Sequence, residues 1–171
     1  LIACEDTRVT QTLLSTYNIS SKLIALEKFS ESRRIKTILN VLDDGKAVAL
    51  VSDAGTPAIS DPGARLVQAA RDAGHCIAPI PGPSAVTALL SIAGISETPF
   101  VFGGFFPRRS AEAKRFLDCV APVTCPIVFY ESGKRLLATL TWLQTQFPSV
   151  IIGAAKELTK QHERFFQGDI E

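Results

Sequence analysis

Short apolar runs that alternate with helical stretches constrain the fold of this chain most strongly. Each run is followed by a polar or Gly/Pro-rich loop, and these loops comprise residues 5–8, 52–63, 81–85, 105–109, 131–135 and 156–160. Strands that alternate with helices over this length favour a parallel sheet. In open α/β sheets, ligands bind at the carboxyl ends of the strands. The sequence therefore predicts an α/β fold that carries its functional residues on these loops.

The stretch 47–63 is the most distinctive of these segments. Residues 47–51 are apolar and predict a buried strand of the parallel sheet. Two glycines and two prolines then end the regular element. Side-chain oxygens follow on Ser52, Asp53, Thr56, Ser60 and Asp61, and the small residues of the loop allow a ligand to approach the backbone. We assign Asp61 to the N-cap of a helix that begins at Pro62.

The order of the elements predicts two domains. The first domain, residues 1–95, is expected to contain strands at 1–4, 22–26, 47–51 and 76–80 and helices up to 17 and at 32–42, 62–73 and 84–93. Residues 94–99 are the best linker candidate. The second domain, residues 96–171, is expected to contain strands at 100–102, 127–130, 150–155 and 163–167 and helices at 111–120 and 136–147. We expect a mainly parallel sheet in the first domain, a mixed sheet in the second, and a ligand cleft between the domains.

The composition excludes several classes of protein. A net charge of +1 gives no global basic field, and no apolar run approaches the length of a membrane span. The four cysteines form no C-x-x-C pair, so no metal site is expected. We expect reduced cysteines and a cytoplasmic protein, with Cys4 and Cys76 as buried thiols. The chain lacks methionine and begins inside an apolar run, so we expect a missing amino-terminal part.

Common catalytic and nucleotide-binding motifs are absent. The sequence contains no G-x-G-x-x-G, no G-x-x-x-x-G-K-[ST], no H-E-x-x-H and no G-x-S-x-G. Instead, the loops read in order E-D-T-R, V-S-D-A-G-T-P-A-I-S-D-P-G, I-P-G-P-S-A, G-F-F-P-R, F-Y-E-S and K-E-L-T-K. In this order they resemble the ribosomal RNA small subunit methyltransferase I family of the tetrapyrrole methylase superfamily.

The resemblance implies a function and a fold. It implies transfer of a methyl group from S-adenosylmethionine to the ribose 2′-hydroxyl of a cytidine in the decoding region of 16S rRNA, in the 30S subunit. It also implies a two-domain tetrapyrrole-methylase-like α/β fold with the cofactor in the cleft between domains, and a homodimer. Two features depart from the family pattern: the opening strand with its T-P-I-G-N-L-type loop is absent, and Gly133-Lys134 stand where Pro-His is common.

The resemblance also implies residues that contact the cofactor. They come from the loop after the first long apolar run, from a helix start and from the second domain: Ala54, Gly55, Thr56, Ile59, Ser84, Ala85, Tyr130, Glu131 and Leu158. Small residues at the first of these positions agree with close approach to the backbone. The helix start offers free N–H groups and the positive end of a dipole.

Methyl transfer to a ribose hydroxyl requires alignment of donor and acceptor and benefits from a base or a polarising cation. The candidates in the strand-end loops are Glu5, Asp6, Asp53 and Glu157 as carboxylates and Lys156 as the cation, and the sequence does not choose among them. An RNA substrate also needs phosphate contacts and an aromatic surface for an unstacked base. We expect these contacts from Arg8, Phe105, Arg108, Arg109, Arg135 and Lys160.

Two other functions remain open from the sequence. A methylase that acts on a small tetrapyrrole has the same fold, but a Gly-Gly-Asp-Pro-type loop would be expected at residues 54–57. A non-catalytic RNA-binding protein on a methylase fold is the other alternative. Binding of S-adenosylmethionine and methylation of 30S subunits discriminate among the three.

Overall fold

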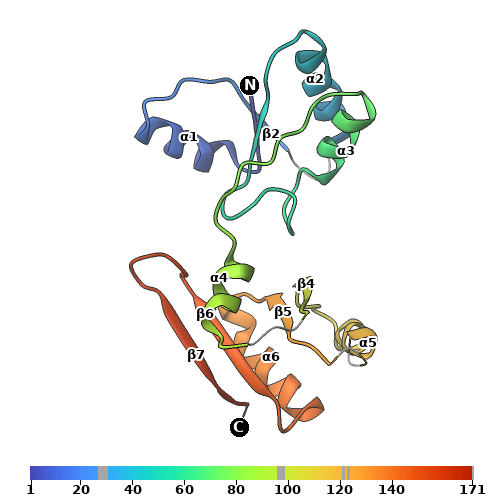
Figure 1. Cartoon of the computed structure of the whole chain (residues 1–171), viewed down its shortest axis with the longest axis vertical. Helices are drawn as coiled ribbons and strands as arrows, with labels where there is room; N and C mark the ends of the chain where they lie inside the picture. Colours follow the sequence, from blue (N-terminus) through green and yellow to red (C-terminus); the bar gives the residue numbers. More distant parts are fainter. Residues whose placement is uncertain (27–30, 96–98, 121, 123, 171) are drawn as a thin grey trace. The chain divides into compact units, whose positions relative to one another are not determined.

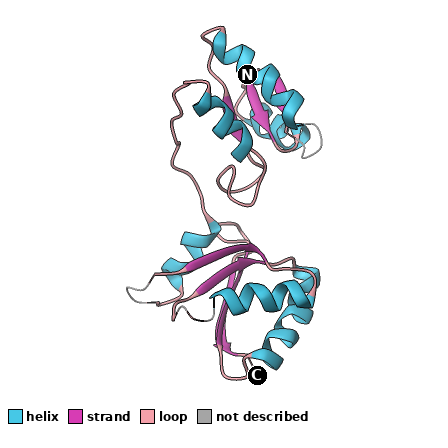
Figure 2. Ribbon diagram, turned by 90° about the vertical axis from the view of Figure 1, so that its right-hand side faces the viewer, coloured by secondary structure: helices cyan, strands magenta, loops and turns pink. Residues whose placement is uncertain are grey.

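The computed structural model describes residues 1–26, 31–95, 99–120, 122 and 124–170. The chain divides into two compact units, Leu1–Pro83 (the first unit) and Ser84–Glu171 (the second unit) (Figures 1 and 2). Both units combine helices and strands, which confirms the α/β class. The domain boundary at residue 95 stays a prediction. Residues 96–98 of the expected linker lie outside the described residues.

A parallel three-stranded sheet forms the centre of the first unit. Strands β1 (Ile2–Cys4), β2 (Leu23–Ala25) and β3 (Ala49–Val51) lie in the order β2-β1-β3, and Ala3 of β1 is opposite Ile24 and Leu50. Helix α1 (Thr7–Thr16) lies on one side of the sheet, and α2 (Glu31–Asp43) and α3 (Ala64–Asp72) lie on the other (Figure 1). The parallel sheet predicted for this part of the chain is therefore present.

The alternation of side chains along β1 explains how both faces of this sheet are covered. Ala3 packs with Ile38 of α2 and Leu66 of α3 in one buried cluster. The neighbouring Cys4 is fully buried, and burial raises the pKa of its thiol above the ordinary value. Successive side chains of a strand point to opposite faces, so β1 is buried on both sides, as expected for a parallel strand.

Three expectations for the first unit are wrong. Residues 76–80 form no strand, and Cys76 is exposed. Pro79 lacks the N–H group that a sheet ladder needs, which disfavours a central strand here. Strand β3 is only partly buried, since it pairs with β1 and no other described strand. Asp61 does not cap α3: the helix begins at Ala64, and its N-cap is Gly63 with a φ of 126°.

The second unit contains two separate strand pairs. Helix α4 (Ala85–Ile92) precedes β4 (Val101–Phe105), α5 (Ser110–Val120), β5 (Ile127–Tyr130), α6 (Gly133–Gln146), β6 (Ile151–Lys156) and β7 (Arg164–Asp169). β4 and β5 are parallel, with an irregularity between Phe102 and Phe105, and β6 and β7 are antiparallel. The described residues of this unit therefore hold parallel and antiparallel strands in two separate pairs, not in the single mixed sheet expected from the sequence.

The core of the second unit is aromatic. Phe106, Ala113, Leu117 and Leu143 are buried together, and the ring of Phe106 packs against Phe129 and Trp142 at centroid distances of 4.8 and 5.9 Å. This core holds α5 and α6 against the β4–β5 pair. The segment that carries the Phe105–Arg109 loop is thereby tied to the interior of the unit.

Two boundaries in the second unit differ from expectation. Strand β4 continues through the two glycines at 103 and 104, which the sequence suggested as part of a loop. Helix α6 begins at Gly133, so Gly133, Lys134 and Arg135 form its first turn rather than a loop. Among the described residues, no helix has the length and apolar character that crossing a bilayer requires.

Candidate functional site

The carboxyl ends of β1 and β3 bring predicted catalytic residues together. The backbone N–H of Asp6 donates to Oδ1 of Asp53 at 3.2 Å, and the backbone N–H of Asp53 donates to Oε2 of Glu5 at 3.3 Å. Because β1 and β3 are neighbouring parallel strands, residues that directly follow them meet at one edge of the sheet. Glu5, Asp6 and Asp53 are therefore linked, although 47 or 48 positions separate them in sequence.

Asp6 has a structural role within this group. Its carboxylate caps α1 by accepting the backbone N–H of Arg8 at 2.8 Å, and it pairs with the Arg8 guanidinium at 2.6 Å. These hydrogen bonds hold the pKa of Asp6 at about 2. A carboxylate of such low pKa is a weak proton acceptor, so Asp6 is a poorer candidate base than Glu5.

The pKa values of Glu5 and Asp61 are raised, whereas that of Asp6 is lowered. Burial raises the pKa of Glu5 above its ordinary 4.5, the hydrogen bond from the Asp53 backbone N–H partly offsets this, and the nearby carboxylates of Asp61, Asp53 and Asp6 add to the rise. Burial and then Asp53 raise the pKa of Asp61, while a hydrogen bond from Ser52 lowers it. We call Glu5, Asp53 and Asp61 the acidic cluster. The raised pKa values of Glu5 and Asp61 bring these two carboxyls closer to neutral pH, which suits proton acceptance.

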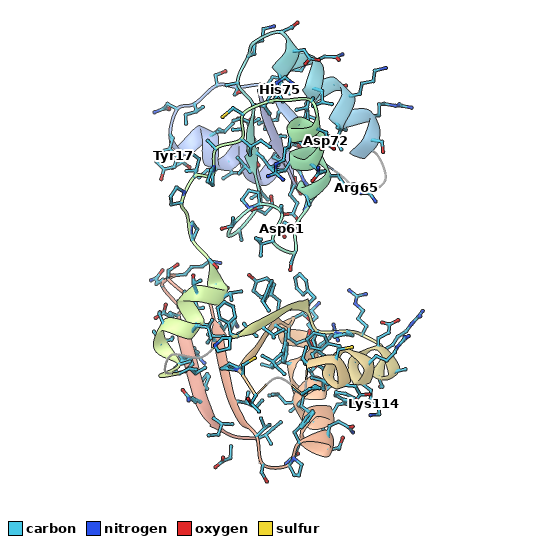
Figure 3. All side chains as sticks on the ribbon, turned by 45° about the vertical axis from the view of Figure 1, so that its right-hand side comes forward. Tyr17, Asp61, Arg65, Asp72, His75 and Lys114 are labelled. Atoms are coloured by element: carbon cyan, nitrogen blue, oxygen red, sulfur yellow. The ribbon has the colours of Figure 1, made fainter. Side chains whose placement is uncertain are left out.

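Asp61 is the residue whose placement the sequence analysis missed. It lies on the loop beyond the strand ends of the first unit (Figure 3). Its place before Pro62 favoured a helix cap, but the cap falls at Gly63 instead. The signal that could have found it is the spacing from Asp53, since both residues belong to the polar loop that leaves the same strand.

The backbone of the loop 52–63 has several residues with positive φ. Gly55 and Gly63 have φ values of 69° and 126°, and the non-glycine residues Ala58 and Ser60 also have positive φ, 68° and 67°. Non-glycine residues in this region carry backbone strain, which clusters at ligand sites. Side-chain hydrogen bonds hold the winding: Ser52 donates to the Ala54 carbonyl and Thr56 donates to the Pro83 carbonyl, both at 3.1 Å.

The predicted cofactor residues of this loop are accessible. Ala54, Gly55 and Thr56 are exposed, and so is about half of the Ile59 side chain. A hollow of about 490 Å³ lies beside the loop, between α1 and residues Val51, Ser52 and Asp53. The loop thus presents backbone and a small apolar surface next to the acidic cluster.

The remaining cofactor candidates lie in the second unit. Ser84 is the N-cap of α4 in extended conformation, and its side chain makes no capping hydrogen bond to the described helix. Ala85 is the first residue of that helix. The ring of Tyr130, at the end of β5, packs edge-on against Phe102 and Phe105 at 5.0 and 5.4 Å.

The carboxylate of Glu131 points into the second unit. Its Oε1 accepts the Ser132 N–H at 2.6 Å, its Oε2 accepts the Thr139 hydroxyl at 2.6 Å, and Arg135 lies 3.3 Å away. Arg135 also donates to the carbonyl oxygens of Phe106 at 3.3 Å and Pro107 at 3.0 Å. Both side chains, predicted for cofactor and for RNA, are therefore engaged inside the unit.

The other predicted RNA residues lie on surfaces. Phe105 is 60% exposed, and the Arg109 side chain is 83% exposed with Glu112 at 3.4 Å. Arg108 adjoins them on the same loop. Phe105, Arg108 and Arg109 thus combine an open ring with cationic side chains.

The last candidates gather at the turn between β6 and β7. Lys156 ends β6, and Glu157 follows with a φ of 53° and pairs with Lys160 at 3.4 Å. Leu158 lies between them in this turn. Glu157 is committed to that ion pair, which is exposed and contributes little to stability.

Comparison with known proteins identifies the family. The chain has a parallel sheet with acidic strand ends and a second α/β unit, and the family model Tetrapyrrole (Corrin/Porphyrin) Methylases matches its residues 1–171. The chain therefore belongs to this family.

Individual relatives agree on a narrower group. The chain is 42% identical over 170 residues to "Ribosomal RNA small subunit methyltransferase I" of Neisseria meningitidis serogroup B, which covers 99% of this chain and 58% of that protein. It is 41% identical to the protein of the same name in Thermotoga maritima, covering 99% of this chain and 76% of that protein. The relative of that name in Escherichia coli O157:H7 is 41% identical over 164 residues, 57% of its length. The chain spans about three fifths of the Neisseria and Escherichia proteins, and the resemblance found from its motifs is confirmed.

Proposed function

We propose that this protein is a methyltransferase that acts on ribosomal RNA. Its specific reaction, in this proposal, is transfer of a methyl group from S-adenosylmethionine to the ribose 2′-hydroxyl of a cytidine in the decoding region of 16S rRNA. The observation that carries the proposal is the link between Glu5 and Asp53 across two parallel strand ends, beside the exposed and wound loop 52–63. The name shared by the relatives favours RNA over a tetrapyrrole as the substrate.

The loop 52–63 has the features that S-adenosylmethionine requires. Ala54, Gly55 and Thr56 expose a backbone without bulky side chains, and Ile59 offers an apolar surface. The cofactor carries a positively charged sulfonium, which nearby carboxylates attract. When bound, it supplies an electrophilic methyl group and a good leaving group. We assign Ala54, Gly55, Thr56 and Ile59 to its binding, and Ser84, Ala85, Tyr130, Glu131 and Leu158 stay predicted contacts.

Glu5 is the base that the electrostatics favour. A ribose hydroxyl is a poor nucleophile until its proton is removed, and a base works best when its pKa is near the working pH. Among the candidates in the first unit, Glu5 has a raised pKa and Asp6 a lowered one. We propose that Glu5 accepts the proton of the hydroxyl, while the backbone N–H of Asp53 orients the Glu5 carboxylate.

The second unit supplies a surface for RNA. Phe105 is an exposed ring next to Arg108 and Arg109, a combination that suits an unstacked base and its phosphates. A homodimer, a cytoplasmic location and the 30S subunit as partner are part of the proposal through the family resemblance.

Calorimetry with S-adenosylmethionine tests the role of the loop. Gly55→Val adds bulk at an exposed backbone that the cofactor is proposed to approach, so binding should be lost. Gly74→Val is the matched control, since Gly74 also has a positive φ, 83°, and a Cβ there would meet no described atom within 4 Å. Both variants carry the strain of a side chain at positive φ, on the order of 1–2 kcal/mol. Equal affinity in Gly55→Val and Gly74→Val, with similar melting temperatures, would remove the loop from the cofactor site.

A further inference from the structure

We propose that Arg135 positions the RNA-binding loop instead of contacting RNA. The loop in question is Phe105–Arg109, and Glu131 with Thr139 sets the orientation of Arg135. The inference rests on the proposed function, because it concerns the loop to which RNA binding was assigned above. It replaces the expectation, drawn from sequence, that Arg135 binds phosphate directly.

The carboxylate of Glu131 is the fixed point of this arrangement. Its side chain is only 4% exposed, and both of its oxygens accept hydrogen bonds of 2.6 Å, from the Ser132 N–H and the Thr139 hydroxyl. Thr139 is itself buried. A buried carboxylate needs a cationic partner and complete hydrogen bonding, and Arg135 at 3.3 Å provides the positive charge.

Arg135 connects Glu131 to the loop Phe105–Arg109 through hydrogen bonds to two loop carbonyls. Arg135 lies in the first turn of α6, and Glu131 stands between the end of β5 and the N-cap Ser132, so the ion pair joins the helix start to the segment that follows the strand. Nη1 donates to the Phe106 carbonyl, and Nη2 donates to the carbonyls of Phe106 and Pro107. The Phe106 N–H also donates to the Tyr130 carbonyl at 2.9 Å. Hydrogen bonds from Arg135 and to the Tyr130 carbonyl therefore fix the backbone of Phe106 and Pro107, which lie between Phe105 and Arg108.

The geometry makes Arg135 poorly suited to phosphate. Its side chain is 31% exposed and its guanidinium points to two backbone carbonyls and one carboxylate, whereas the Arg109 side chain is 83% exposed. A guanidinium has donors in a rigid fork, so one Arg can bond several acceptors in fixed directions. A Lys at this place keeps the charge but loses the fork. A comparison of Arg135→Lys with the unaltered chain therefore tests the positioning role of Arg135 without removing its positive charge.

The test measures binding of a fluorescein-labelled single-stranded oligocytidine RNA to the full chain and to its variants. Arg135→Lys should weaken binding about tenfold, the penalty expected when two or three side chains of a loosened loop must be ordered on binding. Glu131→Gln removes a negative charge, which by electrostatics alone should strengthen RNA binding, but we expect it to weaken binding. In an Arg108→Ala/Arg109→Ala background, Arg135→Lys should have a much smaller effect, because it acts through that loop and only Phe105 of its RNA contacts remains.

The single tryptophan gives a readout that does not depend on RNA. Trp142 packs against Phe106, so loosening of the loop should shift its fluorescence in Arg135→Lys and Glu131→Gln proteins that still melt cooperatively. Thr139→Val, which removes one hydrogen bond of Glu131 but no charge, should shift it in the same direction. It serves as the second variant if Glu131→Gln does not fold.

Failure of this inference and failure of the proposed function give different results. If Arg135→Lys keeps the RNA affinity and the Trp142 emission while Arg108→Ala/Arg109→Ala binds weakly, Arg135 does not position the loop. If Arg135→Lys weakens binding equally with and without the loop substitutions, Arg135 contacts RNA directly and the inference is overturned. If Arg108→Ala/Arg109→Ala binds RNA as tightly as the unaltered chain, the loop is not the RNA site. The RNA role assigned to the loop and the positioning role of Arg135 are then both refuted.

Discussion

Gly103→Ala is expected to destabilise the second unit, because the ring of Phe116 occupies the space beside Gly103. A Cβ at residue 103 would lie 2.2 Å from Cζ and 2.5 Å from Cε2 of Phe116. Ordinary contacts begin near 3.4 Å, so the ring must retreat by about 1 Å into a packed core. Phe116 packs against the buried cluster and meets Phe106 edge-on at 6.3 Å.

Overpacking of this kind costs about 1–3 kcal/mol. For a domain of roughly 60–100 residues, that corresponds to a melting temperature lower by about 5–20 °C. Thermal unfolding followed by circular dichroism measures the change. Gly133→Ala is the control, since a Cβ there meets no described atom within 4 Å and residue 133 begins a helix in which Ala is favoured.

The second substitution that identifies the cause is Phe116→Leu. In the Gly103→Ala background the smaller side chain should recover part of the lost stability, although Phe116→Leu alone destabilises by leaving a cavity. The two changes should therefore be non-additive. An unchanged melting temperature in Gly103→Ala, or strictly additive losses, would refute the packing described for β4 and α5.

Three further predictions concern the acidic strand ends. Because the folded protein raises the pKa of Asp61 above its ordinary 3.8, the charged carboxyl destabilises the fold at neutral pH. Asp61→Asn should therefore raise the melting temperature near pH 7, and this advantage should shrink as the pH falls through the raised pKa and be gone once it reaches 3.8. For Asp6, whose pKa is lowered to about 2, the stabilisation is present above 3.8 and is lost between 3.8 and about 2, so Asp6→Asn should flatten this part of the stability curve in acid titrations of unfolding. Glu5→Gln should lower kcat for methyl transfer by about 10²–10⁴-fold, with a much smaller loss of calorimetric affinity for S-adenosylmethionine; equal kcat would exclude Glu5 as the base.

Much of the fold could be predicted from local patterns. The strand Ile127–Tyr130 was predicted with its observed bounds, since four apolar residues stand between a proline and a polar loop. The positions of Glu5 and Asp53 directly after strands were also predicted, and the observed pairing of β1 with β3 is what brings the two residues together. In both cases the signal lies in the strand itself and in the residue that follows it.

Other features depend on packing that the sequence does not display. Gly103 suggested the end of a strand, yet β4 continues because the Phe116 ring fits against the bare backbone. The spacing of Glu131 and Arg135 indicates an ion pair only when the helix is known to begin at Gly133. Residues 76–80 are apolar like a strand, but pairing also requires backbone donors, and Pro79 provides none.

The reaction itself can be tested by the fate of a labelled methyl group. The chain is incubated with S-adenosylmethionine labelled in the methyl group and with 30S subunits, and the extracted 16S rRNA is hydrolysed in alkali. A 2′-O-methyl group blocks cleavage at its own nucleotide, because that cleavage requires a free 2′-hydroxyl. We predict that the label appears in an alkali-stable dinucleotide whose 5′ residue is cytidine. Label in mononucleotides, or no label although calorimetry shows bound S-adenosylmethionine, would contradict the proposed ribose methylation.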